Sequence, residues 1–367
     1  MKNITKYSTW AEIDLQSIKH NLDNIKNKTN KKTKICGVVK ANAYGHGIIE
    51  ISKFLESQNV DYLSVARIEE AINIRSNNIN LPILVLGYVC PENIEDAIKN
   101  NITICVYSLE IAQKIDNISN KLRRKIKVHI KVDTGMNRLG FNFQNIYEIQ
   151  EVFKLDNIEV EGIFTHLATA DEVDRTFSNL QNQRFKNLLG KLNLSKDIIV
   201  HLSNSANTYY LPDGEYDMVR CGIALYGCKP DESMPDNIDI KPALTLKCRV
   251  SNIKTIDSGD GISYGISYTA KQKEKIATIT IGYADGFFRG QSNPQVIIKN
   301  EIFDVVGRIC MDQCMVKIDK EIELKIGDEV TIFSSRNIKA SDVAKRAGTI
   351  SYEILTSLSH RVVRLYK

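Results

Sequence analysis

A lysine that closes an apolar run and precedes two glycines is the first residue with the surroundings of a reactive group. The run Ile35–Val39 leads into Lys40, and Gly45 and Gly47 follow. We predict a buried strand over Ile35–Lys40, because continuous apolar runs of this length are typical of strands covered on both faces. Two roles are open to the lysine: its ammonium extends to solvent, or a pocket holds it as an amine nucleophile.

Polar side chains also follow four later apolar runs. They occur at Lys131–Gly140, Thr165–His166, His201–Ser205 and Arg220–Ile223. In a barrel of parallel strands, the active site is built at the carboxyl ends of the strands. Packing alone does not account for polar residues at all of these ends. We therefore predict that they form one site with Lys40.

The order of the elements favours such a barrel. Eight apolar runs alternate with amphipathic segments, which is the pattern of parallel strands joined by helices. The predicted strands are Ile35–Lys40, Tyr62–Ala66, Pro82–Gly87, Thr103–Tyr107, Val128–Val132, Val160–Thr165, Ile198–Leu202 and Asp217–Arg220. The predicted helices include Ile48–Leu55, Ile68–Ile74, Ile94–Ile98, Leu109–Ile118, Ile146–Phe153 and Phe185–Leu192. We predict an α/β fold with an N-terminal (β/α)8 TIM barrel rather than an open doubly wound sheet.

A proline-containing stretch marks the predicted domain boundary. Pro230, Pro235 and Pro242 fall in or beside Lys229–Ile240, and strand patterns dominate after it. We predict a barrel domain over residues 1–236, with residues 1–12 pairing with the second domain, and a mostly β domain over residues 237–367. Its predicted strands are Ala243–Ile253, Lys275–Gly282, Val296–Val306, Met315–Ile318 and Glu329–Phe333, and its helices are Ser341–Arg346 and Tyr352–Ser359.

Length and composition exclude several classes of protein. The 367 residues suit a barrel of about 250 residues plus a smaller domain. A net charge of +5 with short basic stretches argues against nucleic-acid binding. No run is long enough to span a bilayer, and the N-terminus lacks the apolar core of a signal peptide. The eight scattered cysteines lack zinc-site spacing, so we expect a cytoplasmic protein without a metal.

The end of the eighth predicted strand has the features of an anion site. Gly222 lets the backbone approach a ligand closely, and barrels commonly bind phosphate after strands seven and eight. Ser205 adds a hydroxyl group. A lysine with a phosphate site indicates Schiff-base chemistry. Two classes remain open: a lysine aldolase acting on a phosphorylated substrate, and a pyridoxal phosphate enzyme.

Two tyrosine segments in the second domain narrow the choice. Tyr264 stands among turn-forming residues in Gly261–Gly265, and Tyr352 lies in Thr349–Glu353. A third segment, Gly307–Asp312, carries an arginine and a methionine after a glycine. Either tyrosine alone is an ordinary residue more often than a catalytic one.

Taken together, these segments resemble the alanine racemase family, whose members are pyridoxal phosphate enzymes with a barrel and a β domain. The resemblance covers nearly the whole chain and rests on the order and spacing of six segments. They are Ala11–Asp14, Val39–Gly47, Lys131–Met136, Thr165–Glu172, Arg220–Gly227 and Gly307–Asp312.

The resemblance implies interconversion of L- and D-alanine by two bases. Lys40 would bind pyridoxal 5'-phosphate covalently and act as the base on one face of the substrate. Tyr264 of a partner subunit would act on the other face, so the protein would be a homodimer with shared active sites. The product D-alanine would supply peptidoglycan.

Further site residues follow from the same resemblance. Arg220 would face the pyridine nitrogen, with His166 as its hydrogen-bond partner. The residues implied to hold the phosphate are Tyr44, Ser205, Gly222, Ile223 and Tyr352. Arg138 and the backbone of Met311 would receive the substrate carboxylate, and the family's frequent carbamate would stand on Lys131. Asn137 departs from the family, which usually has glycine there, but asparagine tolerates left-handed backbone geometry.

Four rival functions remain at this stage. A racemase that prefers serine or several amino acids would share the architecture, although the bulk of Tyr352 favours alanine. A non-catalytic cofactor carrier would not need the β domain or Tyr264. A decarboxylase of the same fold would be longer and carry acidic groups for a basic substrate side chain. A lysine aldolase would have no use for the second domain.

Overall fold

The chain folds into two compact units. The computed structural model describes residues 6–210, 216–234, 238–319 and 321–367. Lys19–Leu225 and Lys229–Ile240 form one unit, here called the barrel unit. Met1–Ile18, Tyr226–Cys228 and Lys241–Lys367 form the other, called the β unit. The predicted cut between residues 236 and 237 falls outside the described residues.

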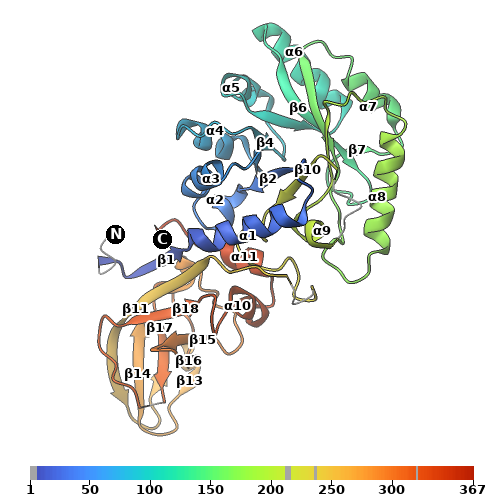
Figure 1. The fold of residues 1–367 in the computed structure, drawn as a ribbon. Helices are drawn as coiled ribbons and strands as arrows, with labels where there is room; N and C mark the ends of the chain where they lie inside the picture. The colour runs from blue at the N-terminus through green and yellow to red at the C-terminus, as the bar shows by residue number, and fades with distance from the viewer. Residues whose placement is uncertain (1–5, 211–215, 235–237, 320) are drawn as a thin grey trace. The chain divides into compact units, whose positions relative to one another are not determined.

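The barrel unit contains the predicted closed ring of eight parallel strands (Figure 1). Its neighbours follow the order β5-β4-β3-β2-β10-β9-β8-β6, and β5 pairs with β6 to close the ring. The strands are β2 (Lys34–Val38), β3 (Tyr62–Val65), β4 (Ile83–Val85), β5 (Thr103–Val106), β6 (Ile126–Asp133), β8 (Ile158–Phe164), β9 (Ile199–His201) and β10 (Met218–Cys221). A short strand, β7 (Phe141–Asn142), adds to β6 outside the ring.

Helices follow the barrel strands and lie outside them in Figure 1. They are α3 (Ile48–Ser57), α4 (Ile68–Ser76), α5 (Ile94–Lys99), α6 (Leu109–Leu122), α7 (Ile146–Val152), α8 (Thr176–Leu189) and α9 (Ser205–Tyr210), with a single turn η2 (Pro91–Asn93) before α5. The Ser108 hydroxyl accepts the Ile111 N–H at 3.3 Å and so caps α6. The helix α1 (Leu15–Lys28) precedes β2 and buries Ile18, Leu22 and Ile25.

The β unit is built on a sheet that also closes on itself. The order is β14-β17-β16-β15-β18-β11, and β14 pairs back with β11. The strands are β11 (Leu244–Ile256), β14 (Glu274–Ile279), β15 (Gln295–Ile298), β16 (Glu301–Val306), β17 (Cys314–Ile318) and β18 (Glu329–Phe333). The flanking strands β1 (Thr9–Ile13) and β19 (Val363–Tyr366) extend this sheet beyond β11, so the N-terminal segment pairs within the β unit.

Shorter elements complete the β unit. The hairpin of β12 (Gly261–Ile262) and β13 (Tyr268–Thr269) encloses the single turn η4 (Tyr264–Ile266). A second turn, η5 (Tyr283–Asp285), and the helices α10 (Ala340–Ala347) and α11 (Ser351–Thr356) follow later in the chain. The β12–β13 hairpin packs on an apolar cluster that contains Ile256, Ile262, Ala270, Ile276 and Val306.

Two predicted strands need correction. The segment Val296–Val306 is a hairpin rather than one strand, because Lys299 and Asn300 turn the chain with φ values of 50° and 68°. Positive φ at both central residues suits a two-residue hairpin turn, but Lys-Asn is a weaker signal than Asn-Gly. The first barrel strand ends at Val38, so Lys40 is not its last residue. The helix predicted over Phe185–Leu192 also begins earlier, at Thr176.

Candidate active site

Lys40 precedes a turn whose residues have left-handed backbone geometry. The segment α2 (Lys40–Tyr44) has φ values of 52°, 55°, 52° and 51° at Ala41, Asn42, Ala43 and Tyr44. Left-handed geometry costs a residue other than glycine roughly 1–2 kcal/mol. Four consecutive residues in this region therefore require strong bonds elsewhere to hold them.

A carboxylate that the sequence reasoning missed supplies part of that restraint. Glu70 on α4 accepts the Ala41 N–H at 2.6 Å through one oxygen, and the N–H groups of Ala66 and Arg67 through the other. The Asn42 side chain also accepts the Ile48 N–H at 2.9 Å. Glu70 is the third residue after Arg67, the residue that precedes the helix. A glutamate at this spacing is typical of helix starts, and that pattern could have identified Glu70 from the sequence.

The turn brings Tyr44 against the loop after β10. A Cβ atom added at Gly222 would stand 2.5 Å from the Tyr44 hydroxyl oxygen, so only glycine admits the ring there. The Ser205 hydroxyl accepts the Gly222 N–H at 2.9 Å and lies 3.5 Å from the Ala224 nitrogen. Ile223 between them is buried. The Tyr44 and Ser205 hydroxyls, which meet at this glycine-containing loop, have the chemistry of a phosphate cradle.

Arg220 is buried and bonded to His166, the hydrogen-bond partner that the resemblance implies. Its Nη2 lies 3.1 Å from His166 Nδ1 and donates to the carbonyl oxygens of Thr165 and Leu202, each at 3.0 Å. Its Nη1 donates to His201 Nδ1 at 2.7 Å. None of these four bonds uses Nε. Burial lowers the pKa of Arg220 to about 10, which leaves the guanidinium charged near neutral pH.

Four basic side chains act on one histidine at this end of the barrel. Burial first, and then the positive charges of Arg220, Lys131, Arg138 and Lys40, hold the pKa of His166 well below its usual range. A neutral His166 can accept the Arg220 N–H, since an imidazolium would have no free lone pair. The structure thus brings these five predicted residues into one electrostatic cluster, and such a cluster suits an anionic ligand.

The two lysines of the cluster are both shifted towards the neutral amine. Burial and then Arg138 lower the pKa of Lys40, while Glu70 opposes the shift. Lys131 is 6% exposed, and burial followed by Arg220 lowers its pKa to about 7. The Lys131 ammonium donates to the Val132 carbonyl oxygen at 2.8 Å. Both amines are therefore more nucleophilic near neutral pH than an exposed lysine.

Arg138 follows a tight turn after β6. Asp133 accepts the N–H groups of Gly135 and Asn137 at 2.8 and 3.1 Å. Asn137 adopts φ = 55°, the left-handed geometry expected of asparagine in place of glycine. The Arg138 side chain is exposed.

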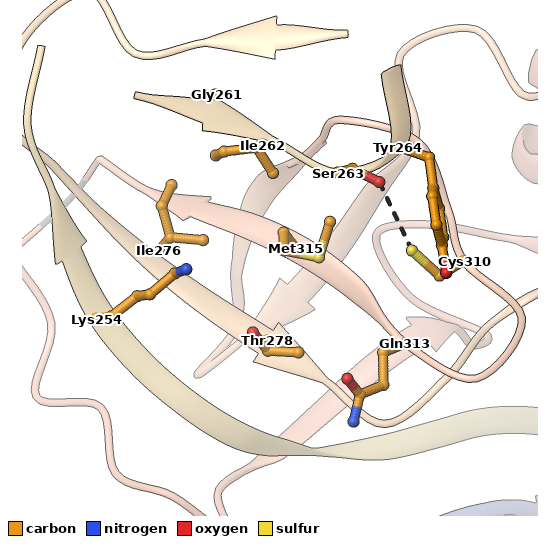
Figure 2. A pocket seen from close by; sticks show the side chains of 10 residues that line it. All are labelled: Lys254, Gly261, Ile262, Ser263, Tyr264, Ile276, Thr278, Cys310, Gln313 and Met315. Carbon is orange, nitrogen blue, oxygen red and sulfur yellow. Dashed lines mark hydrogen bonds between the residues drawn. The ribbon is translucent and has the colours of Figure 1, made fainter. Parts of the chain in front are cut away.

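The remaining predicted residues, Tyr264, Met311 and Tyr352, belong to the β unit. Tyr264 is 71% exposed and lines a cavity of about 400 Å³ with Ser263, Cys310 and Gln313 (Figure 2). The Ser263 hydroxyl donates to the Arg308 carbonyl oxygen at 2.6 Å and so fixes the residue before Tyr264. Tyr352 lies in α11 and is partly buried.

Met311 lies in a turn that is held from two sides. A Cβ atom at Gly282 would come within 2.3 Å of the Cys310 and Met311 carbonyl oxygens, which shows how closely the two backbones approach. Arg361 pairs with Asp285 at 2.6 Å and with Asp312 at 2.8 Å, and thereby joins the two loops. The Met311 side chain is 53% exposed. Sequence reasoning did not identify Arg361, which stands far from the turn in the chain.

The described residues contain neither a candidate metal site nor a membrane-spanning helix. Across residues 6–210, 216–234, 238–319 and 321–367, no group of three or more histidine, cysteine or acidic side chains is arranged to bind a metal ion. In the same part of the chain, no helix combines the length and apolar character needed to cross a membrane.

Comparison with known proteins gives consistent matches along the chain. Family models described as alanine racemase N-terminal and C-terminal domains match residues 13–230 and 243–366. Alanine racemase from Methanococcus maripaludis is 44% identical, over 99% of this chain and 100% of its own length. Alanine racemase from Clostridium difficile 630 superposes with a TM-score of 0.96 at 51% identity, covering 99% of this chain and 96% of its own. Its complex with cycloserine superposes with a TM-score of 0.93 at 50% identity, covering 98% and 96%.

Proposed function

Because the chain belongs to the alanine racemase family and is an amino-acid racemase, we propose that it interconverts L- and D-alanine with pyridoxal 5'-phosphate and two bases. Lys40 acts on one face of the substrate, and Tyr264 of a second subunit acts on the other. Inversion of the α-carbon needs proton removal on one face and proton return on the opposite face, which a single lysine cannot supply.

The observation that carries this proposal is the group of four basic side chains, two arginines and two lysines, around His166. Lys40, Lys131, Arg138 and Arg220 stand close enough together to lower the pKa of one neutral imidazole. Their mutual repulsion is relieved by a ligand with several negative charges. A cofactor phosphate and a substrate carboxylate together provide such charges.

The donor groups of the barrel unit fit this cofactor. Glycine at position 222 leaves room for the Tyr44 ring, and the Tyr44 and Ser205 hydroxyls at the loop after β10 are groups that can bind a phosphate. Arg220 offers a permanently charged donor for a ring nitrogen, and Lys40 offers an amine. When bound, pyridoxal phosphate supplies the electron withdrawal that acidifies the α-hydrogen of an amino acid. Tyr352 is proposed as a further phosphate ligand.

The barrel residues are suited to handle the proton. The lowered pKa of Lys40 increases the fraction of neutral amine, which is the form that accepts a proton. Arg220 only donates hydrogen bonds and has no proton to exchange near neutral pH. It therefore orients a ring nitrogen without protonating it, and Lys40 retains the task of moving the α-proton.

The substrate carboxylate is assigned to Arg138 and the Met311 backbone. A guanidinium matches a carboxylate in charge and in fork geometry. Lys131 lies in the same electrostatic cluster as Arg138. A carbamate on Lys131 would replace a repelling cation with an anion able to bond Arg138, and the pKa of about 7 favours the neutral amine that reacts with CO₂.

The partner assignment rests on exposure. The proposed base Tyr264 is 71% exposed. The apolar side chains of Ile266 and Met311 are 65% and 53% exposed. An exposed apolar group of this kind is typical of an interaction surface. A homodimer would cover it and give each active site a tyrosine from the other subunit. We assign the reaction to the cytoplasm and its product to peptidoglycan synthesis.

Hydrogen exchange at the α-carbon tests the function directly. The purified protein is incubated with pyridoxal phosphate and either L- or D-alanine in deuterated water, and isotope and chirality are followed by mass spectrometry and chiral chromatography. We expect both enantiomers to exchange and interconvert. Equal or faster turnover of serine would assign the protein to a broader racemase, and no exchange with either amino acid would refute the proposal.

A further inference from the structure

A row of buried polar side chains crosses the interior of the barrel behind Arg220. Arg220 Nη1 lies 2.7 Å from His201 Nδ1, and His201 Nε2 lies 2.8 Å from His129 Nδ1. His129 Nε2 in turn faces Glu161 Oε2 at 3.4 Å. These residues come from β10, β9, β6 and β8, so the row joins four strands of one ring.

Arg220 forces the direction of every bond in the row. A guanidinium can only donate, so His201 Nδ1 must accept, and a neutral His201 then carries its proton on Nε2. That proton is donated to His129 Nδ1, which places the His129 proton on Nε2. This Nε2 makes no hydrogen bond among the described residues but stands 3.4 Å from the Glu161 carboxylate, whose negative charge favours a proton there. The negative charge of Glu161 at the other end of the row favours the same direction.

The surroundings hold both rings in this single arrangement. His129 and His201 are fully buried, and burial lowers the pKa of each. A second proton on either ring would sit on Nδ1, where it would face the N–H donor of the preceding residue in the row. Phe164 stacks on His201 with centroids 4.6 Å apart and planes 6° from parallel. A Cβ atom at Gly162 would stand 2.6 Å from the His129 ring, so glycine is needed beside it.

Glu161 is fixed at the other end of the row. Its carboxylate accepts from Tyr62 and from Thr103, and pairs with Lys127 at 2.8 Å. Its side chain is 18% exposed, whereas that of Lys127 is 43% exposed. The row thus runs from a solvent-contacting ion pair to the guanidinium that the proposed function places at the cofactor.

We propose that Glu161 is a positioning residue that, through His129 and His201, orients the Arg220 guanidinium towards the cofactor ring nitrogen. The inference rests on the proposed function for the identity of that ligand. The row holds Nη1, while the carbonyl oxygens and His166 hold Nη2. The guanidinium plane is then fixed with Nε left for the ligand. Without the carboxylate charge beside His129 Nε2, only Arg220 sets the direction of the row, and the two rings can reorganise.

Proton positions in the unaltered protein give the first test. The six histidines are labelled with ¹⁵N, and two-bond ¹H–¹⁵N spectra are recorded with and without pyridoxal phosphate. We expect His129 and His201 to be neutral with the proton on Nε2 from about pH 5 to about pH 8. An imidazolium, or a proton on Nδ1 of either ring, would overturn the proposal. This measurement needs no variant to fold and no activity.

Two matched variants give the second test. Glu161→Gln removes the charge at the end of the row, whereas Glu159→Gln removes a carboxylate on the same strand that also approaches Lys127, at 4.0 Å. We expect Glu161→Gln to release pyridoxal phosphate on the order of tenfold faster and Glu159→Gln to behave as the unaltered protein. The absorbance of cofactor bound to Glu161→Gln is also expected to change between about pH 5 and pH 8, because a displaced guanidinium no longer keeps the ring nitrogen unprotonated.

The outcomes separate this inference from the function on which it rests. Equal cofactor release and equal absorbance profiles for the two variants, in a protein that racemises alanine, would overturn the role of Glu161 and leave the function intact. Failure of the unaltered protein to exchange the α-hydrogen would refute the function, while the histidine spectra would still decide whether the row exists.

Discussion

The two proposed bases stand in opposite surroundings. Lys40 lies in the barrel unit beside a turn that Glu70 and Asn42 hold by hydrogen bonds, and burial and Arg138 shift its pKa. Tyr264 lies in the β unit and is 71% exposed. Both stand next to residues with positive φ, Ala41 and Ser263, so each is presented by a constrained backbone.

The difference indicates which parts of the site one chain prepares by itself. The barrel unit already sets the charge, the burial and the hydrogen-bond pattern around Lys40. The β unit fixes the backbone beside Tyr264, through the bond from Ser263 to Arg308, but leaves the phenol in solvent. We infer that the barrel half of the site is preorganised in each chain, whereas the environment of Tyr264 is completed on assembly.

Removal of the lysine is expected to have the largest effect. Lys40→Ala should lower alanine racemisation on the order of 10⁴-fold or more, because it removes both the covalent attachment and one base. Chiral chromatography of the product measures the loss, and the visible absorbance of bound cofactor should disappear. Lys53→Ala, at an exposed lysine of α3, is the control and should retain full activity. Racemisation by Lys40→Ala would remove the lysine from the mechanism.

Removal of the tyrosine hydroxyl is expected to have a large but one-sided effect. Tyr264→Phe should retain the visible absorbance and lose racemisation by about 10²–10⁴-fold, with exchange that starts from L-alanine affected most. Deuterium incorporation from each enantiomer measures the asymmetry. Tyr147→Phe, at another exposed tyrosine, should leave both rates unchanged. A symmetrical loss from both enantiomers would contradict the assignment of the bases to opposite faces.

The smallest expected effect concerns the thermal stability of the barrel unit and the cost of burying Lys131. The pKa of Lys131 is about 7 in the folded chain, against an ordinary value of 10.5. Between about pH 7 and pH 10.5, Lys131 is therefore mostly neutral in the folded chain and mostly protonated in the unfolded chain. The penalty for burying Lys131 is complete below about pH 7 and fades as the pH rises towards about 10. Lys131→Met should therefore melt about 2–4 °C above the parent at about pH 6, with a smaller difference at high pH.

Calorimetry in CO₂-depleted buffer measures this difference. Lys127→Met is the control on the same strand: Lys127 pairs with Glu161, so its removal should lower the melting temperature or leave it unchanged. With ¹³C-labelled bicarbonate, a carbamate on Lys131 should give a carbon resonance that Lys131→Met lacks. A melting difference independent of pH would contradict the assigned pKa, and the absence of that resonance would contradict the carbamate.

Much of the barrel could be predicted because its signal is local. Each of the eight strands is an apolar run, and the polar residues after them are visible in the sequence without knowledge of any contact. Lys40, Lys131, His166 and Arg220 were therefore predicted to meet, and the structure brings them into one electrostatic cluster. The roles of these residues in catalysis stay predictions.

The features that were missed depend on contacts between distant segments. The left-handed turn at residues 41–44 opposes the local preference of alanine and tyrosine and exists because Glu70, from the next helix, bonds its backbone. His129 in β6 and Glu161 in β8 are single polar residues within strands, and the residues that they contact lie on other strands. The β15–β16 hairpin was missed for a different reason, since Lys-Asn resembles ordinary strand sequence more than a turn.

The turn after Lys40 also limits which substitutions the chain tolerates. β-Branched residues at positions 41 to 43 would be rejected in a mutational library whatever their effect on chemistry, because their side chains clash in left-handed backbone. A chemically synthesised chain with D-alanine at positions 41 and 43 would find these torsions favourable. The segment is thus a place where the mirror-image form of a residue suits the fold better than the genetically encoded one.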